Sequence, residues 1–231
     1  MGISKKCAGI SDPREIRLLA EKLIEEILRI REDGGNRRIS LFELLPIVPR
    51  DAAIIRGIKM EEAEELDSHR IVEGAADTNT SRIRIARTML RRRQRFTEAH
   101  ELGHLLLGHP PGIHLRVADE SGTRPPAEMG ADKFATEFLM PEPIVTMVYG
   151  HYFEEALNHR ALTENQAYFL CASLPQKFSR ADFARMSLRE FSKIVSVVTS
   201  FGGAPFRPLV DLFDVSAESM ARRLEELRYL S

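Results

Sequence analysis

The run His100-Glu101-Leu102-Gly103-His104 brings two imidazoles and a carboxylate together, and these groups commonly surround a catalytic metal ion. Histidines four residues apart share one face of a helix, with Cβ atoms about 6 Å apart. That spacing suits two imidazole nitrogens on one zinc ion at roughly 2.0–2.1 Å. Glu101 flanks such an ion rather than binding it, so its carboxylate can hold and deprotonate a water molecule. We therefore predict His100 and His104 as zinc ligands and Glu101 as a general base.

A catalytic zinc ion usually has three protein ligands and one open position. Glu128 is the better candidate for the third ligand, because it opens a second helix after a loop. Asp132 follows one turn later and can accept a hydrogen bond from a ligand histidine. A proline stands six residues after the second histidine, which excludes a metzincin site. Three alternative ligands stay open, namely Glu137, His114 and His109, although His109 is expected to point away from the motif's second histidine.

Two helices must position these side chains. The first helix is predicted over about residues 88–109, because this segment contains no proline. Gly108 and the two prolines that follow it then end the helix. Gly103 inside this helix costs roughly 1 kcal/mol relative to alanine, and its small size suggests that another element packs closely there. The second helix is predicted over residues 128–140 and is stopped by Pro141.

The segments before these helices change in character along the chain. Asp12 provides a capping signal for a helix that a glycine pair ends near residue 35. Residues 41–45 and 52–66 are also predicted to be helical, with the acidic run 61–65 on a solvated face.

Short β-structure is predicted next. Residues 71–77 and 82–86 indicate two short strands or a hairpin, because the second segment alternates charged and apolar residues. A polar turn at residues 78–80 joins them. Residues 110–127 hold prolines and glycines without periodicity, and we predict a loop there.

Composition excludes several classes of protein. A chain of 231 residues can bury a sizeable core, and its net charge of -1 gives no overall attraction to nucleic acid or acidic membranes. Its two cysteines, Cys7 and Cys171, are far apart and form no metal-binding motif, which fits a reducing cytosol. No stretch approaches the ~18 apolar residues of a membrane span. We therefore expect a cytoplasmic protein without a membrane partner.

Two segments resemble the ImmA/IrrE family of metallo-endopeptidases. Residues 95–109 read RFTEAHELGHLLLGH, similar to the family's run RFTxAHELGHxLLGH. Residues 128–141 read EMGADKFATEFLMP, similar to ExxAxxFAxxLLMP. The resemblance covers roughly residues 70–145 and fades over the N-terminal helices.

This resemblance implies a set of roles. His100, His104 and Glu128 would bind zinc, and Glu101 would be the general base. Gly130 stands where many relatives carry a second acid, so the contacts around the ligands are expected to differ. Several members of the family cleave a DNA-binding repressor, so the resemblance implies a protein substrate of this kind.

Other features have simpler interpretations. The arginine-rich stretch over residues 82–95 could contact DNA or an acidic partner, but we favour a solvated face of a strand and helix. Residues 208–227 resemble a helix-turn-helix with Ser216 as cap, yet Glu218 would repel phosphates, which favours a packing role. Direct nucleic-acid binding is therefore not expected. An oxyanion donor could come from four side chains after the second motif, which are Tyr149, His151, Tyr152 and His159.

The sequence thus predicts a mainly helical α+β fold with a small sheet or hairpin packed on the HExxH helix. We expect an N-terminal helical region over residues 1–68, a zinc-peptidase core over 69–145 and a C-terminal helical region over 146–231. The expected function is that of an intracellular zinc-dependent endopeptidase acting on a protein. The alternatives are a non-hydrolytic metal-binding regulator and a DNA-binding regulator acting through its C-terminal helices. Manganese in place of zinc stays open.

Overall fold

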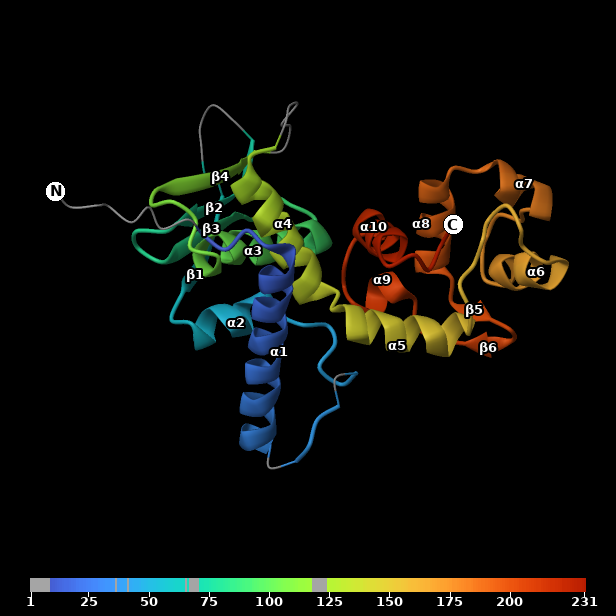
Figure 1. The fold of residues 1–231 in the computed structure, drawn as a ribbon, viewed down its shortest axis with the longest axis horizontal. Coiled ribbons are helices and arrows are strands. Elements are labelled where there is room, and N and C mark those ends of the chain that lie inside the picture. Colours follow the sequence, from blue (N-terminus) through green and yellow to red (C-terminus); the bar gives the residue numbers. More distant parts are fainter. Residues whose placement is uncertain (1–8, 36, 41, 65, 67–70, 118–123) are drawn as a thin grey trace. The chain divides into compact units, whose positions relative to one another are not determined.

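The computed structural model describes residues 9–35, 37–40, 42–64, 66, 71–117 and 124–231. The chain divides into two compact units, Met1–Leu139 and Met140–Ser231 (Figure 1). Along the described residues it forms ten helices and six strands, which confirms the predicted mainly helical α+β class. The three sequence regions with boundaries near residues 68 and 145 stay a prediction.

The first unit contains a mixed sheet of four strands. Its strands are β1 (Lys59–Ala63), β2 (Val72–Asp77), β3 (Arg82–Ala86) and β4 (Ile113–Val117). They lie in the order β1-β3-β2-β4, with β1 parallel to β3 and the other neighbours antiparallel. Ile83 and Ile85 are fully buried, whereas Arg82 and Arg84 are exposed. The alternation that predicted the hairpin β2–β3 is therefore confirmed.

The prediction of a helix over residues 52–66 is correct only as far as Ile55 and is wrong after it. Helix α2 covers Pro49–Ile55, and Gly57 then takes a left-handed φ of 65°, a conformation that favours glycine and ends a helix. Residues 59–63 form β1, which pairs in parallel with β3. The glutamates at 61 and 62 therefore lie on a strand instead of a helix face.

Two further local predictions are corrected. Residues 113–117 were expected in a loop, but they form β4, because β2 offers an edge that pairs Ala75 with Leu115. The Thr78 side chain also accepts a hydrogen bond from the Gly112 N–H at 2.9 Å. Residues 42–44 form a turn rather than part of a helix, since Pro46 follows closely and disfavours helical backbone before it. Residue 41 lies outside the described residues.

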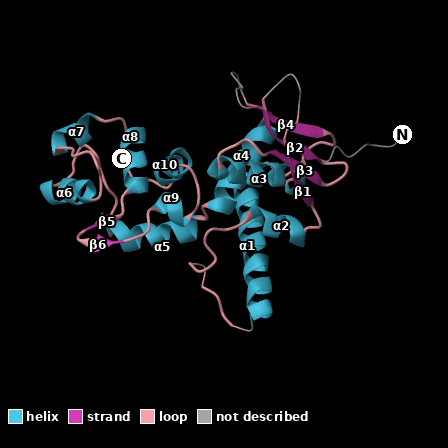
Figure 2. Ribbon diagram, turned by 180° about the vertical axis from the view of Figure 1, so that it is seen from behind, coloured by secondary structure: helices cyan, strands magenta, loops and turns pink. Residues whose placement is uncertain are grey.

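Three long helices complete the first unit (Figure 2). They are α1 (Pro13–Gly35), α3 (Arg91–Leu106) and α4 (Pro126–Leu139), all close to their predicted positions. Helix α4 packs against α1 and α3, and α3 packs against β2 and β3. A Cβ atom on Gly103 would lie 3.1 Å from the Ala131 Cα atom and 3.2 Å from the Phe134 ring. Glycine at this position thus brings α3 and α4 close together, as its small size suggested.

The second unit is helical, as predicted, with one small hairpin added. Its elements are α5 (Glu142–Phe153), α6 (Glu164–Ala172), α7 (Arg180–Arg185), α8 (Leu188–Val197), β5 (Ser200–Phe201), β6 (Ala204–Pro205), α9 (Leu209–Leu212) and α10 (Ala217–Glu226). Helices α9 and α10 confirm the two short helices predicted over residues 209–227. The Ser216 hydroxyl accepts a hydrogen bond from the Ser219 N–H at 3.0 Å and caps α10.

Among the described residues, no helix is both long and apolar enough to span a membrane.

Candidate metal centre

Helix α3 carries both histidines and the glutamate of the HExxH run into the interior. His100 and Glu101 have no exposed surface and His104 has 1%. The Nε2 atoms of the two histidines lie 3.1 Å apart, as expected for residues one helical turn apart with rings turned to the same side. Both imidazoles therefore present a nitrogen to one point.

Helix α4 brings the third side chain to the same point from its first turn. Glu128 Oε2 lies 3.0 Å from His100 Nε2, and Glu128 Oε1 lies 3.3 Å from His104 Nε2. The ligand atoms of these three residues all lie within 4.8 Å of one another. In the part of the chain that the structure describes, no other group of three His, Cys, Asp or Glu side chains has this geometry. The two histidines and Glu128 are thus brought together as the sequence predicted.

Asp132 holds the far side of His100. Its Oδ1 atom lies 2.9 Å from His100 Nδ1 and 3.0 Å from Arg116 Nη1, and Arg124 also contacts the carboxylate. Burial would raise the pKa of Asp132, but its contacts with His100 and Arg116 lower the pKa to about 2. An ionised Asp132 therefore fixes His100 with Nε2 directed at Glu128. Asp132 thus lies where the sequence placed a partner for a ligand histidine, whereas Arg116 was not anticipated.

Burial and hydrogen bonding act in opposite directions on the pKa values of the three candidate ligands. Burial disfavours the charged imidazole at His104 and lowers its pKa. Burial acts in the same direction at His100, but hydrogen bonds to Asp132 and Glu128 raise its pKa. Burial would also raise the pKa of Glu128, yet its bonds with the two histidines hold that pKa well below its usual range. The Glu128 carboxylate is therefore charged at neutral pH and available to a cation.

Glu101 is fully buried and closely packed. Neither of its carboxyl oxygens has a hydrogen-bond partner among the described residues. Burial raises its pKa to about 8, although the charges of His100 and Arg116 act in the opposite direction. A Cβ atom on Gly74 would lie 2.6 Å from Glu101 Oε1 and 2.5 Å from Thr97 Cγ2. Only glycine at position 74 of β2 leaves room for this carboxyl, a role that the sequence did not indicate.

These residues fit a divalent cation. Two imidazole nitrogens and one carboxylate are a common donor set for zinc, and a buried carboxyl without a partner lies next to them. The family model described as the IrrE N-terminal-like domain matches residues 59–225. The chain belongs to this peptidase family. No curated protein matches the chain.

Membership of the IrrE N-terminal-like family makes the chain a metallopeptidase-type protein. The match begins at the first residue of β1 and ends within α10, so it extends beyond the resemblance seen over residues 70–145. The candidate metal centre lies inside the matched segment.

Two of the alternative ligands of this IrrE-like domain have other partners. Glu137 is bound by Lys133 at 2.7 Å, further along α4. His114 stacks on the His104 ring at a centroid distance of 4.4 Å, and its Nε2 atom lies 2.9 Å from the Pro110 carbonyl oxygen. Neither belongs to the cluster of three candidate ligands.

The expectation that His109 points away from His104 is wrong. Helix α3 ends at Leu106, and Gly108 then takes a left-handed φ of 67° that turns the chain back. His109 Nδ1 consequently lies 2.8 Å from His104 Nδ1. Helical periodicity could not reveal this contact, because it depends on the turn after the helix.

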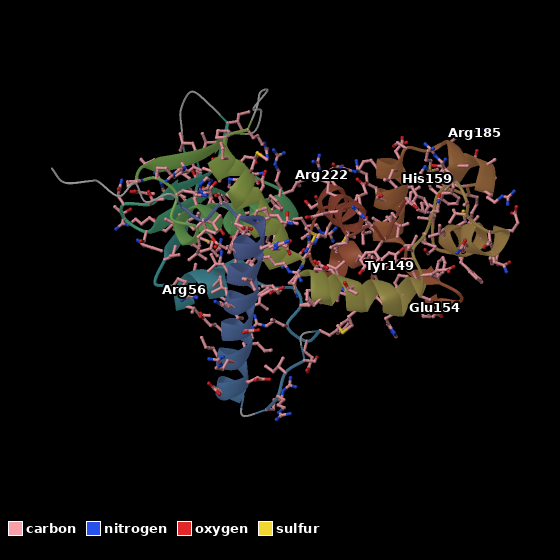
Figure 3. All side chains as sticks on the ribbon, in the orientation of Figure 1. Arg56, Tyr149, Glu154, His159, Arg185 and Arg222 are labelled. Carbon is pink, nitrogen blue, oxygen red and sulfur yellow. The ribbon has the colours of Figure 1, made fainter. Side chains whose placement is uncertain are left out.

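The side chains considered as oxyanion donors belong to the second unit, where Figure 3 labels Tyr149 and His159. The Tyr149 hydroxyl donates to the Tyr229 carbonyl oxygen at 3.2 Å. His159 Nδ1 lies 2.7 Å from the Ser231 carbonyl oxygen. Both side chains therefore have a bonding role within that unit.

Proposed function

We propose that this protein is a zinc-dependent endopeptidase that hydrolyses peptide bonds in a protein substrate. The convergence of His100, His104 and Glu128 beside the buried carboxyl of Glu101 carries the proposal. Nitrogen donors from two histidines favour zinc over magnesium or calcium, which prefer oxygen donors alone. Membership of a metallopeptidase family supports the same reaction class.

A zinc ion held by these three side chains would polarise the scissile carbonyl and favour ionisation of water. Glu101 would take the proton of the attacking water and later pass it to the leaving amine. Burial raises its pKa in the metal-free chain, whereas the charge of a bound cation would act in the opposite direction and favour the ionised form that a general base needs. Asp132 would keep His100 in the orientation that directs Nε2 at the centre.

Strand β4 offers a place for an extended substrate. It lies at the edge of the sheet and pairs with β2 alone among the described strands. His114 on β4 stacks on His104, and Arg116 contacts Asp132, so the strand runs alongside the candidate ligands. An extended peptide can add to such an edge through main-chain hydrogen bonds.

The family resemblance supports a DNA-binding repressor as the protein that is cut.

The test is cleavage by purified Glu101→Gln protein, which keeps the shape of the side chain but has no general base. We expect cleavage of a repressor-like partner encoded nearby to fall by roughly 100-fold or more, with zinc content unchanged. Glu98→Gln is a matched control, because Glu98 is also buried on α3 but contacts Arg50. It should keep cleavage near the wild-type rate.

Full cleavage by Glu101→Gln would contradict the hydrolytic mechanism. If instead wild-type protein binds the partner and zinc without cutting, and Glu101→Gln binds equally well, the non-hydrolytic regulator is the better description.

A further inference from the structure

We infer that His109 is a positioning residue for His104, and that its Nδ1 atom accepts a hydrogen bond from His104 Nδ1–H. The inference rests on the proposed function, because it takes His104 as a metal ligand. The observation behind it is the 2.8 Å distance between the two Nδ1 atoms, which is hydrogen-bond distance.

The direction of this hydrogen bond follows from the ligand role. A neutral imidazole carries one proton, so one ring nitrogen donates and the other accepts. His104 Nε2 faces His100 Nε2 at 3.1 Å and Glu128 Oε1 at 3.3 Å, and a nitrogen that binds a metal must be unprotonated. The proton of His104 is therefore on Nδ1 and points at His109 Nδ1. His109 in turn carries its own proton on Nε2.

His109 is held in place for this task. It has 8% exposed surface, and its main-chain N–H donates to the His104 carbonyl oxygen at 3.2 Å. Gly130 on α4 lies beside the ring, where a Cβ atom would be 3.4 Å from His109 Nε2. His109 also lines a cavity of about 350 Å³ together with Thr78 and Asn79.

The two candidate ligand histidines are thus supported in parallel but by different chemistry. His100 Nδ1 faces the carboxylate of Asp132, whereas His104 Nδ1 faces the imidazole of His109. Partners of this kind fix the orientation of a ligand histidine, and their loss typically weakens metal affinity. His114 also touches His104, but only by stacking, so it offers a comparison within the same site.

The experiment compares zinc affinity and the visible spectrum of the cobalt-substituted protein for four chains. These are wild type, His109→Asn, His109→Leu and the control His114→Phe. Asn Oδ1 can occupy the place of His Nδ1 and accept the same hydrogen bond, whereas leucine fills the space without an acceptor. The phenylalanine keeps the stacking on His104.

We expect His109→Leu to lose roughly 10–100-fold in zinc affinity, with His109→Asn and His114→Phe within about threefold of wild type. The cobalt spectrum should change only in His109→Leu. Wild-type affinity and spectrum in folded His109→Leu would overturn the inference, as would equal losses in the Asn and Leu variants. If His109→Leu does not fold, ring ¹⁵N shifts of zinc-bound wild type decide, because protonated Nε2 on His109 is required.

Failure of this inference can be told from failure of the proposed function. Wild-type protein that binds no zinc refutes the proposed function. Wild-type protein that binds zinc, with His109→Leu indistinguishable from it, refutes only the role of His109.

Discussion

At Glu101, burial favours the neutral carboxyl, whereas the proposed role as general base needs the ionised form. Burial raises the pKa of its carboxyl from 4.5 to about 8 in the metal-free protein. Below pH 4.5 the carboxyl is protonated in folded and unfolded chains alike. Between pH 4.5 and about 8 the unfolded chain releases the proton first, so this group increasingly destabilises the metal-free fold as pH rises.

Glu101→Gln, which cannot ionise, should therefore stabilise the metal-free protein more at pH 8 than at pH 5. The increase in the free energy of unfolding caused by the substitution should be larger at pH 8 than at pH 5, by on the order of a few kcal/mol. Urea unfolding of both chains at each pH measures it. An equal effect of the substitution at both pH values would show that the carboxyl is not held neutral by burial.

Gly74 should be sensitive to substitution, because it faces the carboxyl of the proposed general base. A methyl group at position 74 would overlap Glu101 Oε1 and Thr97 Cγ2, so Gly74→Ala must displace the carboxyl. We expect peptidase activity to fall at least ~10-fold, because small misplacement of a catalytic group is costly. Gly34→Ala is the control, since nothing lies within 4 Å of a Cβ there. Unchanged steady-state rates in Gly74→Ala would contradict this account of Glu101.

At the scale of elements, the centre depends on how closely α3 and α4 approach. The two helices approach each other at Gly103, where a larger side chain would meet Ala131 and Phe134 of α4. Gly103→Leu should destabilise the protein by about 1–3 kcal/mol and weaken zinc binding, because it forces the two helices apart. Gly150→Leu is a matched control on α5, where nothing lies within 4 Å and leucine favours the helix. Thermal unfolding compares them, and equal melting temperatures would count against close packing.

The sequence predicted those elements that carry a clear period. The α3 and α4 helices have proline stops, and the β2–β3 hairpin has alternation, so their positions could be predicted. Strand β1 could not, because its segment lacks a strand pattern and its pairing partner lies far away in the sequence. Residues 113–117 do alternate apolar and polar side chains, but this short pattern lies in a segment with many prolines and glycines and was missed. Arg116 was missed together with β4, whereas the role of Gly74 depends on the close approach of α3 to β2, which no local pattern reveals. His100 and His104 could be singled out because their spacing is a property of one helix, and Glu128 because it opens a second helix with Asp132 one turn later.

Across the chain, the two units differ in the functional residues that they contain. The candidate metal centre lies wholly in the first unit, Met1–Leu139, while the family match continues through most of the second. Three basic residues at and near α10 pair with one glutamate. Glu218 on α10 contacts Arg222 at 2.9 Å and Lys193 at 2.7 Å, and it also contacts Arg189. Such neutralised charges are unsuited to holding phosphates.

We therefore predict that the full chain binds duplex DNA only weakly, with a non-specific dissociation constant of roughly 10⁻⁴–10⁻⁶ M at physiological salt. Arg222→Ala should not weaken this binding more than the control Arg185→Ala; Figure 3 labels both positions. Fluorescence anisotropy with a labelled duplex measures it. Tight, salt-dependent binding that Arg222→Ala alone abolishes would favour the DNA-binding regulator.

The most direct test of the central claim is zinc titration of metal-free wild type, Glu128→Ala and Glu137→Ala. Glu128 lies within the cluster of candidate ligands, whereas Glu137 lies on the same helix and contacts Lys133. We expect about one zinc ion per chain for wild type and Glu137→Ala, and much weaker binding for Glu128→Ala. Equal affinity in wild type and Glu128→Ala, or loss of zinc only in Glu137→Ala, would contradict the His100-His104-Glu128 centre.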